Sequence, residues 1–146
     1  MTTVAEILKS KPDQQVHTIA AAATVYAALR LIAEKNIGAL LVVENEAIQG
    51  IFTERDYARK VALKGLSSAQ TRVHEVMTSS VLFVQPSDSC AACMQLMSSK
   101  RLRHLPVLEG GHLVGMISIG DLVQAIISEQ QSTIAHLERY IHGAIK

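Results

Sequence analysis

The chain has 146 residues and a formal net charge of +1, with 49% hydrophobic and 18% charged residues. This length and composition suit one compact domain, or two halves that share a core, and exclude a disordered tail. The balanced charge, the absence of a long basic run and the scarcity of aromatic residues argue against a nucleic-acid-binding or membrane-surface protein. The first residues lack the layout of a signal peptide, and the most apolar stretch, residues 19–33, is too short to cross a bilayer. We therefore expect a cytoplasmic protein.

An internal repeat organises the sequence. When the chain is shifted by 65 residues, residues 16–56 align without a gap with residues 81–121 and share nine identities among 41 positions. The lead-in segment 4–8 also recurs, as residues 73–77, but with an offset of 69. The first copy therefore carries four extra residues around Ser10–Asp13. Two copies of one supersecondary unit explain this pattern better than chance.

Each copy opens with a predicted strand and a predicted helix. Short β-branched stretches at Val16–Ile19 and Val81–Val84 are typical of strands. An amphipathic helix follows in each copy, and in the second copy Ser87–Ser89 offers its N-cap.

A β-hairpin and a second helix complete each copy. Strands are expected at Ala39–Val43 and His112–Ile117, with tight turns at residues 44–46 and 109–111. The closing helix begins where a hydroxyl residue can cap it. The order β-α-β-β-α, present twice, predicts the fold class α/β (α+β).

The repeat also predicts the domain boundaries. We expect a first repeat over residues 4–64, a polar linker over 65–72, a second repeat over 73–128 and an additional helix over 129–146. The apolar side chains on one face of that last helix are Ile134, Leu137 and Ile141.

The corner between the last strand and the last helix of each copy carries the candidate chemistry. Thr53 and Ser118 end the strands, and Asp56 and Asp121 follow three residues later on the first helical turn. A helix N-terminus attracts a phosphate, and an ionised Asp accepts hydrogen bonds from a ribose diol. The alternative is an ordinary capping box, which is the simpler explanation for one copy alone. Its recurrence at the same place in both copies favours a binding role.

These features resemble a tandem pair of cystathionine-β-synthase (CBS) domains, also called a Bateman module. The resemblance rests on the motif Gly-hydrophobic-hydrophobic-Thr/Ser-x-x-Asp at residues 50–56 and 115–121 and on the preceding strands, Gly38–Val42 and Arg103–Val107. It covers about residues 4–128. It implies two repeats packed about a pseudo-twofold axis, usually in a disc-like dimer, with clefts between the repeats that bind adenine nucleotides or related adenosyl compounds.

The resemblance implies one cleft around the corner of the second copy. There Asp121 would hold the ribose and Ser118 would face the phosphate. The residues of the first copy that would line the adenine are Thr18, Ile37, Gly38 and Ala39.

The other implied cleft lies around the corner of the first copy, with Thr53 and Asp56. The second copy would contribute Phe83, Leu102, Arg103 and His104. Arg103 is the expected phosphate partner, because a guanidinium offers a fixed fork of donors. Arg55 and Lys100 are weaker candidates for that role. We expect the Asp56 cleft to prefer more charged phosphates and the Asp121 cleft to be less discriminating.

The implied function is a nucleotide sensor without catalytic residues. The candidate ligands share an adenosine half: AMP, ADP, ATP, NAD(H) and S-adenosylmethionine. Binding would shift the packing between repeats or protomers of a homodimer, and an unknown partner protein would read that shift. The alternative is a ligand-free dimerisation module that uses the C-terminal helix with Leu137, Tyr140 and Ile141. An enzyme is disfavoured, because His104 is the one candidate general base.

The cysteines and histidines predict no metal site. Two cysteines cannot complete a tetrahedral zinc site, and the six histidines are dispersed. Cys90 and Cys93 have the C-x-x-C spacing of a redox motif, but they align with Val25 and Ala28 of the first copy. We therefore expect both cysteines to be packing residues.

Overall fold

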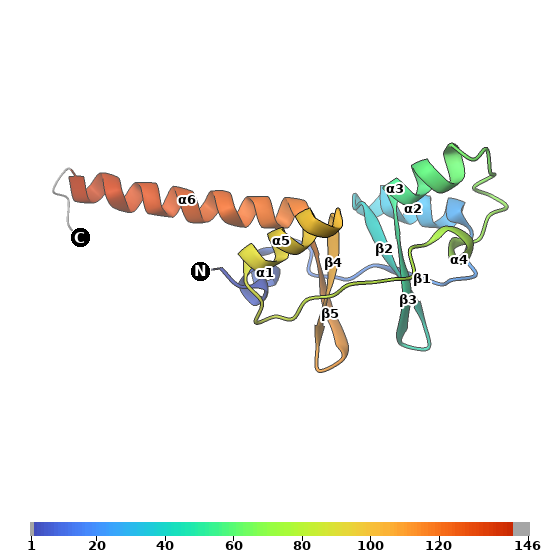
Figure 1. Cartoon of the computed structure of the whole chain (residues 1–146), viewed down its shortest axis with the longest axis horizontal. Helices are drawn as coiled ribbons and strands as arrows, with labels where there is room; N and C mark the ends of the chain where they lie inside the picture. Colours follow the sequence, from blue (N-terminus) through green and yellow to red (C-terminus); the bar gives the residue numbers. More distant parts are fainter. Residues whose placement is uncertain (1, 142–146) are drawn as a thin grey trace. The chain divides into compact units, whose positions relative to one another are not determined.

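The computed structural model describes the backbone of residues 2–141 and the side chains of residues 2–138. The chain forms two compact units (Figure 1). Val16–Leu82 make up the first-repeat unit. The second-repeat unit combines the residues up to Gln15 with those from Phe83 onward. The lead-in segment of the first copy thus packs within the unit that the second copy builds.

The first-repeat unit contains a three-stranded sheet in the order β1-β2-β3. β1 pairs parallel to β2, and β2 pairs antiparallel to β3, so the predicted order β-α-β-β-α is confirmed here. Its elements are β1 (Thr18–Ile19), α2 (Val25–Lys35), β2 (Ala39–Glu44), β3 (Ala47–Thr53), α3 (Glu54–Tyr57), the π-helix η1 (Ala58–Ala62) and α4 (Val73–Val76).

The second-repeat unit contains one antiparallel hairpin, β4-β5, covered by helices. Its elements are α1 (Val4–Ser10), α5 (Cys90–Lys100), β4 (His104–Glu109), β5 (His112–Ser118) and α6 (Ile119–Ile141).

The predicted strand Val81–Val84 is wrong. Val84 alone makes a single parallel bridge to β4. In the first copy, the backbone N–H of Leu41 donates to the carbonyl oxygen of His17 at 3.3 Å. The residue equivalent to Leu41 is Pro106, which has no N–H to donate, so the second copy loses this hydrogen bond and with it the strand.

Both first helices are capped alike, as the repeat predicts. The Thr24 and Ser89 hydroxyls accept hydrogen bonds from backbone N–H groups at the starts of α2 and α5. Both helices end at a left-handed residue, Asn36 with φ 54° and Arg101 with φ 55°. These non-glycine residues end the two helices at equivalent positions.

The hairpin turns also match their prediction. Asn45 and Glu46 connect β2 to β3 with φ values of 49° and 65°, and Gly110 and Gly111 connect β4 to β5 with φ values of 58° and 81°. Two central residues with positive φ give a turn whose twist suits a β-hairpin.

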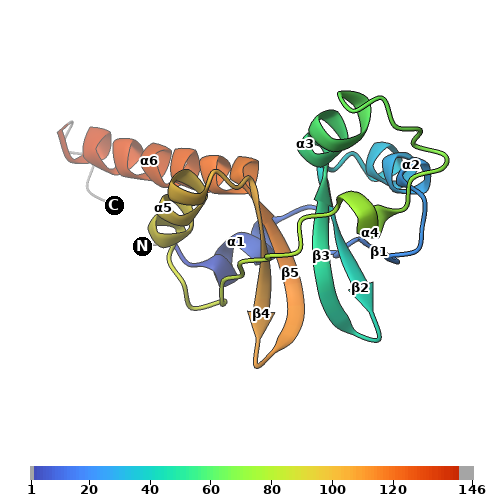
Figure 2. The same cartoon turned by 45° about the vertical axis from the view of Figure 1, so that its right-hand side comes forward.

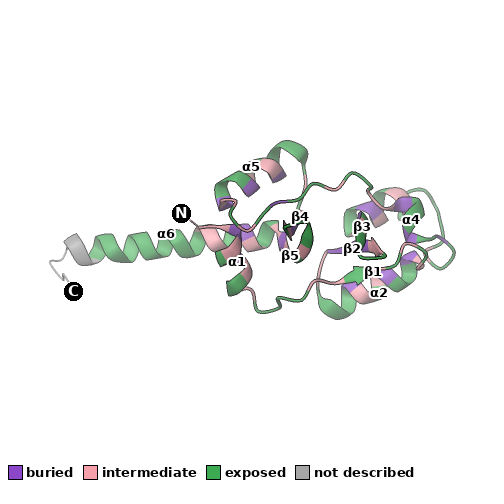
Figure 3. Ribbon diagram, turned by 90° about the horizontal axis from the view of Figure 1, so that it is seen from below, coloured by how far each residue is buried: buried purple, intermediate pink, exposed green. Residues whose placement is uncertain are grey.

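The C-terminal helix differs from its prediction. Residues 129–141 continue α6, which runs unbroken from Ile119, and do not form an additional helix (Figure 2). Neither proline nor glycine occurs from Asp121 to Ile141 to interrupt the helix. The side chains from 127 to 138 are all exposed (Figure 3). Residues 142–146 and the side chains of Tyr140 and Ile141, which the prediction included, lie outside the described residues.

No helix within residues 2–141 combines the length and the apolar character needed to cross a membrane.

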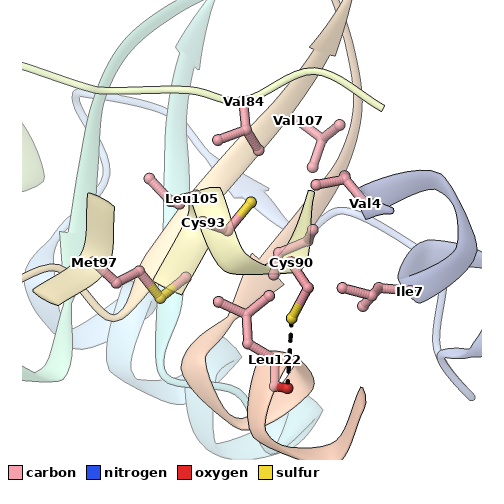
Figure 4. Close-up of a cluster of buried hydrophobic side chains, with 10 residues drawn as sticks. Val4, Ile7, Val84, Cys90, Cys93, Met97, Leu105, Val107 and Leu122 are labelled. Atoms are coloured by element: carbon pink, nitrogen blue, oxygen red, sulfur yellow. Dashed lines mark hydrogen bonds between the residues drawn. The ribbon is translucent and has the colours of Figure 1, made fainter. Parts of the chain in front are cut away.

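The cysteines are packing residues, as predicted. Cys90 and Cys93 lie in the buried core of the second-repeat unit, between α5, the hairpin and α6 (Figure 4). The Cys90 thiol donates to the carbonyl oxygen of Leu122 at 3.9 Å. Burial, with Asp88 and Cys90 nearby, raises the pKa of Cys93 to about 11. Such a thiol carries little thiolate at neutral pH, so it is a poor nucleophile.

A glycine in each hairpin lets a lead-in segment approach the sheet. A Cβ at Gly50 on β3 would lie 2.7 Å from the backbone carbonyl oxygen of Thr78, just after α4. A Cβ at Gly115 on β5 would lie 2.7 Å from Cδ2 of Leu8 on α1. The two glycines are equivalent in the repeat, and each lies where a lead-in segment, or the residue after it, contacts the hairpin. Figure 2 shows α1 beside β5 and α4 beside β3.

Alanine substitutions at the two glycines should lower the stability of the protein by different amounts. Gly50→Ala meets rigid backbone and should destabilise the protein by about 1–3 kcal/mol, whereas Gly115→Ala meets a flexible side chain and should cost less. Gly120→Ala is the control, because its nearest atom would lie at 3.6 Å. Urea unfolding measures all three. Equal stabilities for Gly50→Ala and Gly120→Ala would contradict this packing.

Candidate functional site

The corner of the first-repeat unit is a complete capping box. The Thr53 hydroxyl accepts from the backbone N–H of Asp56 at 3.1 Å, and the Asp56 carboxylate accepts from the backbone N–H of Thr53 at 3.0 Å. Across the hairpin Ala39 pairs with Thr53, and the carbonyl oxygen of Gly38 accepts from Glu54 N–H at 3.1 Å. The structure thus gathers Gly38, Ala39, Thr53 and Asp56 at one strand–helix corner.

The Asp56 carboxylate has further partners besides the backbone N–H of Thr53. Its Oδ1 accepts from the Thr78 hydroxyl at 3.1 Å and pairs with Nζ of Lys60 at 3.1 Å. The Asp56 side chain is only 9% exposed. Nζ of Lys60 also donates to the carbonyl oxygen of Val76 at 3.1 Å, so Lys60 connects the corner to α4. In this arrangement Asp56 serves the internal structure of the unit.

The corner of the second-repeat unit repeats the capping box. Ser118 N–H donates to the Asp121 carboxylate at 2.8 Å, and Asp121 N–H donates to the Ser118 hydroxyl at 3.2 Å. His104 pairs with Ser118 across the hairpin, and the carbonyl oxygen of Arg103 accepts from Ile119 N–H at 2.8 Å. Arg103, His104, Ser118 and Asp121 therefore lie at one corner, equivalent to the four residues of the other unit.

Asp121 is more accessible than Asp56 and is paired with a different cation. Nζ of Lys11 lies 3.0 Å from Oδ2 of Asp121, and both side chains are 21% exposed. Nζ of Lys11 also donates to the carbonyl oxygen of Met116 at 2.7 Å. The residue four positions after Asp121 is Ala125, so this helix has no counterpart of Lys60.

His104 lies at this corner and has a shifted pKa. Burial lowers the pKa of His104 below its usual value, the Asp121 carboxylate opposes that effect, and Lys11 and Arg103 add to it. A neutral imidazole is therefore the stable form at neutral pH.

The remaining predicted residues lie at equivalent places in the two units. Thr18 and Phe83 are exposed and belong to the first extended segment of their copies. Ile37 and Leu102 are partly buried at the ends of α2 and α5. Arg55 is exposed on α3. The two predicted clefts combine residues of both units and stay predictions.

Three contacts of the corners were missed by sequence reasoning. Lys60 lies four residues after Asp56, and this helical spacing could have revealed it. Lys11 lies within the four-residue insertion, and Thr78 follows α4. Neither Lys11 nor Thr78 carries a local sequence signal, because both reach the carboxylates through tertiary packing.

A separate groove lies at the other end of the second-repeat hairpin. Its volume is about 410 Å³, and its lining includes Thr3, Pro86 and Glu109. Its lining contains none of the predicted site residues.

Residues 4–63 and 73–128 both match the CBS domain family, and the chain therefore belongs to that family. A solved protein with CBS domains from Burkholderia ambifaria MC40-6, described as a candidate signal-transduction protein, is 57% identical; the match covers 88% of this chain and 96% of that chain, with a TM-score of 0.86. The mitochondrial CBS domain-containing protein CBSX3 of Arabidopsis thaliana is 39% identical over 97% of this chain and 73% of its own length.

The CBS domain pair of protein MJ0100 was solved in complex with 5′-methylthioadenosine and S-adenosyl-L-methionine. It is 23% identical, covers 88% of this chain and 98% of its own, and has a TM-score of 0.76. The similarity between this chain and MJ0100 is a similarity of fold.

The lowered pKa of His104 predicts a pH dependence of stability. Unfolded His titrates near pH 6.5, so below that pH the unfolded chain takes up a proton before the folded chain does. Folding stability should therefore fall as the pH drops below about 6.5. Urea unfolding at pH 7.5 and 5.5 should show a smaller loss for His104→Gln than for the wild type. The exposed His112→Gln is the control and should behave like the wild type. An equal loss in His104→Gln and the wild type would contradict the assignment.

Proposed function

We propose that this protein is a regulatory module without catalytic activity that binds an adenine nucleotide at its strand–helix corners. The observation that carries the proposal is the hydroxyl–carboxylate pair found at the same corner of both repeats, in a chain of the CBS domain family. An ionised carboxylate accepts hydrogen bonds from both hydroxyls of a ribose, and the capping hydroxyl and the helix N-terminus face a phosphate.

The corner of Asp121 is the favoured ribose site. Asp121 is more exposed than Asp56 and has fewer internal donors. A ligand at Asp121 therefore displaces fewer existing hydrogen bonds. Ser118 then faces the phosphate. The proposed adenine-lining residues from the first copy are Thr18, Ile37, Gly38 and Ala39.

A second ligand position uses the corner of Thr53 and Asp56. Its proposed neighbours are Arg55, Phe83, Leu102, Arg103 and His104. The buried carboxylate of Asp56 must give up the Thr78 hydroxyl or the Lys60 ammonium before it accepts a ribose. Occupancy of this position is therefore expected to need a higher ligand concentration than occupancy at Asp121.

The ligand is proposed to be AMP, ADP or ATP, with NAD(H) and S-adenosylmethionine sharing the same adenosine half. MJ0100 offers the precedent of a CBS pair with adenosyl ligands. A homodimer, a cytoplasmic location and a downstream protein that reads the bound state belong to the same proposal. The signal would be a change in packing that the ligand favours by binding one arrangement more tightly.

The second candidate function is a ligand-free dimerisation module. The observation that favours it is the apolar exposure along α6, where Ile127, Ile134 and Leu137 are 42%, 54% and 51% exposed. A helix with such side chains in water gains stability when a second surface covers them.

Isothermal titration of the nucleotide-stripped protein with AMP, ADP, ATP, NADH and S-adenosylmethionine tests the proposal. We expect saturable binding of at least one ligand. Asp121→Asn should weaken that binding by about 10- to 150-fold, because it removes a charge-assisted hydrogen bond worth about 1.5–3 kcal/mol.

The matched control is Asp88→Asn, which removes a carboxylate that caps Gln85 N–H in the same unit but outside the corner. Asp88→Asn should bind like the wild type. If none of the five ligands binds, the dimerisation module becomes the better explanation. Equal losses in Asp121→Asn and Asp88→Asn would reject the assignment of the ribose site.

A further inference from the structure

Lys11 is a cation that lies outside the two repeated segments of the sequence. It follows α1 directly, in the four-residue insertion that distinguishes the lead-in of the first copy from that of the second. The residues from Pro12 to Gln15 are exposed and irregular, whereas the Lys11 side chain is partly buried against the second-repeat corner. The insertion thus places a lysine beside the carboxylate of Asp121. The helix that Asp121 belongs to, α6, has no counterpart of Lys60.

The contacts of Lys11 leave it able to bind an anion. An ammonium group has three N–H donors. One contact is the Asp121 carboxylate at 3.0 Å, and another is the carbonyl oxygen of Met116 at 2.7 Å. The third N–H can therefore point to a phosphate while the other two keep their partners.

The charges around Asp121 favour an anion. Lys11 and Arg103 are cationic and Asp121 is anionic; Lys11 pairs with Asp121, and all three charges act on His104. His104 is neutral at pH 7, because burial lowers its pKa. The set therefore has a net charge of about +1.

The corresponding set in the first-repeat unit is neutral. Lys60 and Asp56 cancel, and the positions equivalent to Arg103 and His104 are Gly38 and Ala39. Glu54 and Arg55 on the first turn of α3 also cancel. Lys11 and Asp121 cancel in the same way, so the extra positive charge of the Asp121 corner comes from Arg103.

We propose that Lys11 is the specificity-determining residue of the Asp121 corner, and that its ammonium makes this corner select adenosine ligands with a 5′-phosphate over uncharged ones. The inference rests on the proposed nucleotide binding and deepens it. It differs from the sequence-based expectation that the Asp121 cleft is the less discriminating one, because that expectation does not include the ion pair of Lys11 with Asp121.

The test compares AMP with adenosine, which differ only in the phosphate, by isothermal titration against the wild type and Lys11→Met. Loss of a charge-assisted contact should weaken AMP binding by about 10-fold or more. Adenosine binding should change by less than about twofold, because an uncharged ligand gains little from the ammonium. Lys11→Arg, which keeps the charge, should retain most of the preference for AMP.

Lys9→Met is the matched control. Lys9 is exposed in the last turn of α1, two residues before Lys11, so its substitution removes the same charge from the same segment. It should leave both affinities unchanged. Should Lys11→Met fail to fold, Lys11→Gln makes the same comparison, since its amide can still donate to the Met116 carbonyl oxygen.

The outcomes separate this inference from the proposed function. An equal loss of AMP and adenosine binding in the Lys11 variants would show that Lys11 only holds Asp121 in place, and would overturn the inference alone. Unchanged AMP binding would overturn it as well. If the wild type binds another of the five ligands but neither AMP nor adenosine, the inference alone is overturned. If it binds none of the five, the proposed function fails, and the inference fails with it.

Discussion

The hydrogen bond from the last residue of the hairpin to the cap carboxylate organises each repeat. Thr53 N–H donates to Asp56, and Ser118 N–H donates to Asp121, at the point where a strand becomes a helix. This bond fixes the direction in which the helix leaves the sheet, and it satisfies a backbone donor that the helix start leaves without an intrahelical partner. It also holds a negative charge at a corner beside the first residues of the neighbouring strand. The same bond that stabilises the fold therefore positions the group that we propose to bind a ribose.

Both repeats have this hydrogen bond, but a different lysine neutralises the negative charge of the carboxylate in each. In the first-repeat unit Lys60 belongs to the helix that Asp56 caps, and the carboxylate is nearly buried. In the second-repeat unit Lys11 comes from an irregular segment, and both partners are partly exposed. A partly exposed ion pair contributes little to stability, so a ligand can compete for it at low cost. The first corner is therefore better suited to stability and the second to recognition.

Local patterns in the sequence predicted most of the fold, because caps, turns and hairpins depend on neighbouring residues. The caps at Thr24 and Ser89 and the turn at Gly110 follow from residue type alone. Effects that depend on tertiary pairing were not predictable in this way. Pro106 removes a strand that its own segment, Val81–Val84, would otherwise favour, and α6 continues past the expected boundary because no residue stops it. Lys11 reaches Asp121 across 110 positions of the sequence, and no local pattern reports such a contact.

A double-mutant cycle between ligand and protein tests the central claim most directly. The affinities of AMP and 2′,3′-dideoxy-AMP are measured by isothermal titration for the wild type and for Asp121→Asn. If the cap carboxylate holds the ribose diol, removal of the two hydroxyls should weaken binding to the wild type by about tenfold or more. The same change should have less than about a twofold effect on Asp121→Asn, because the acceptor for the diol is already weakened. An equal loss in both proteins would contradict the claim and would leave Asp121 as a helix cap only.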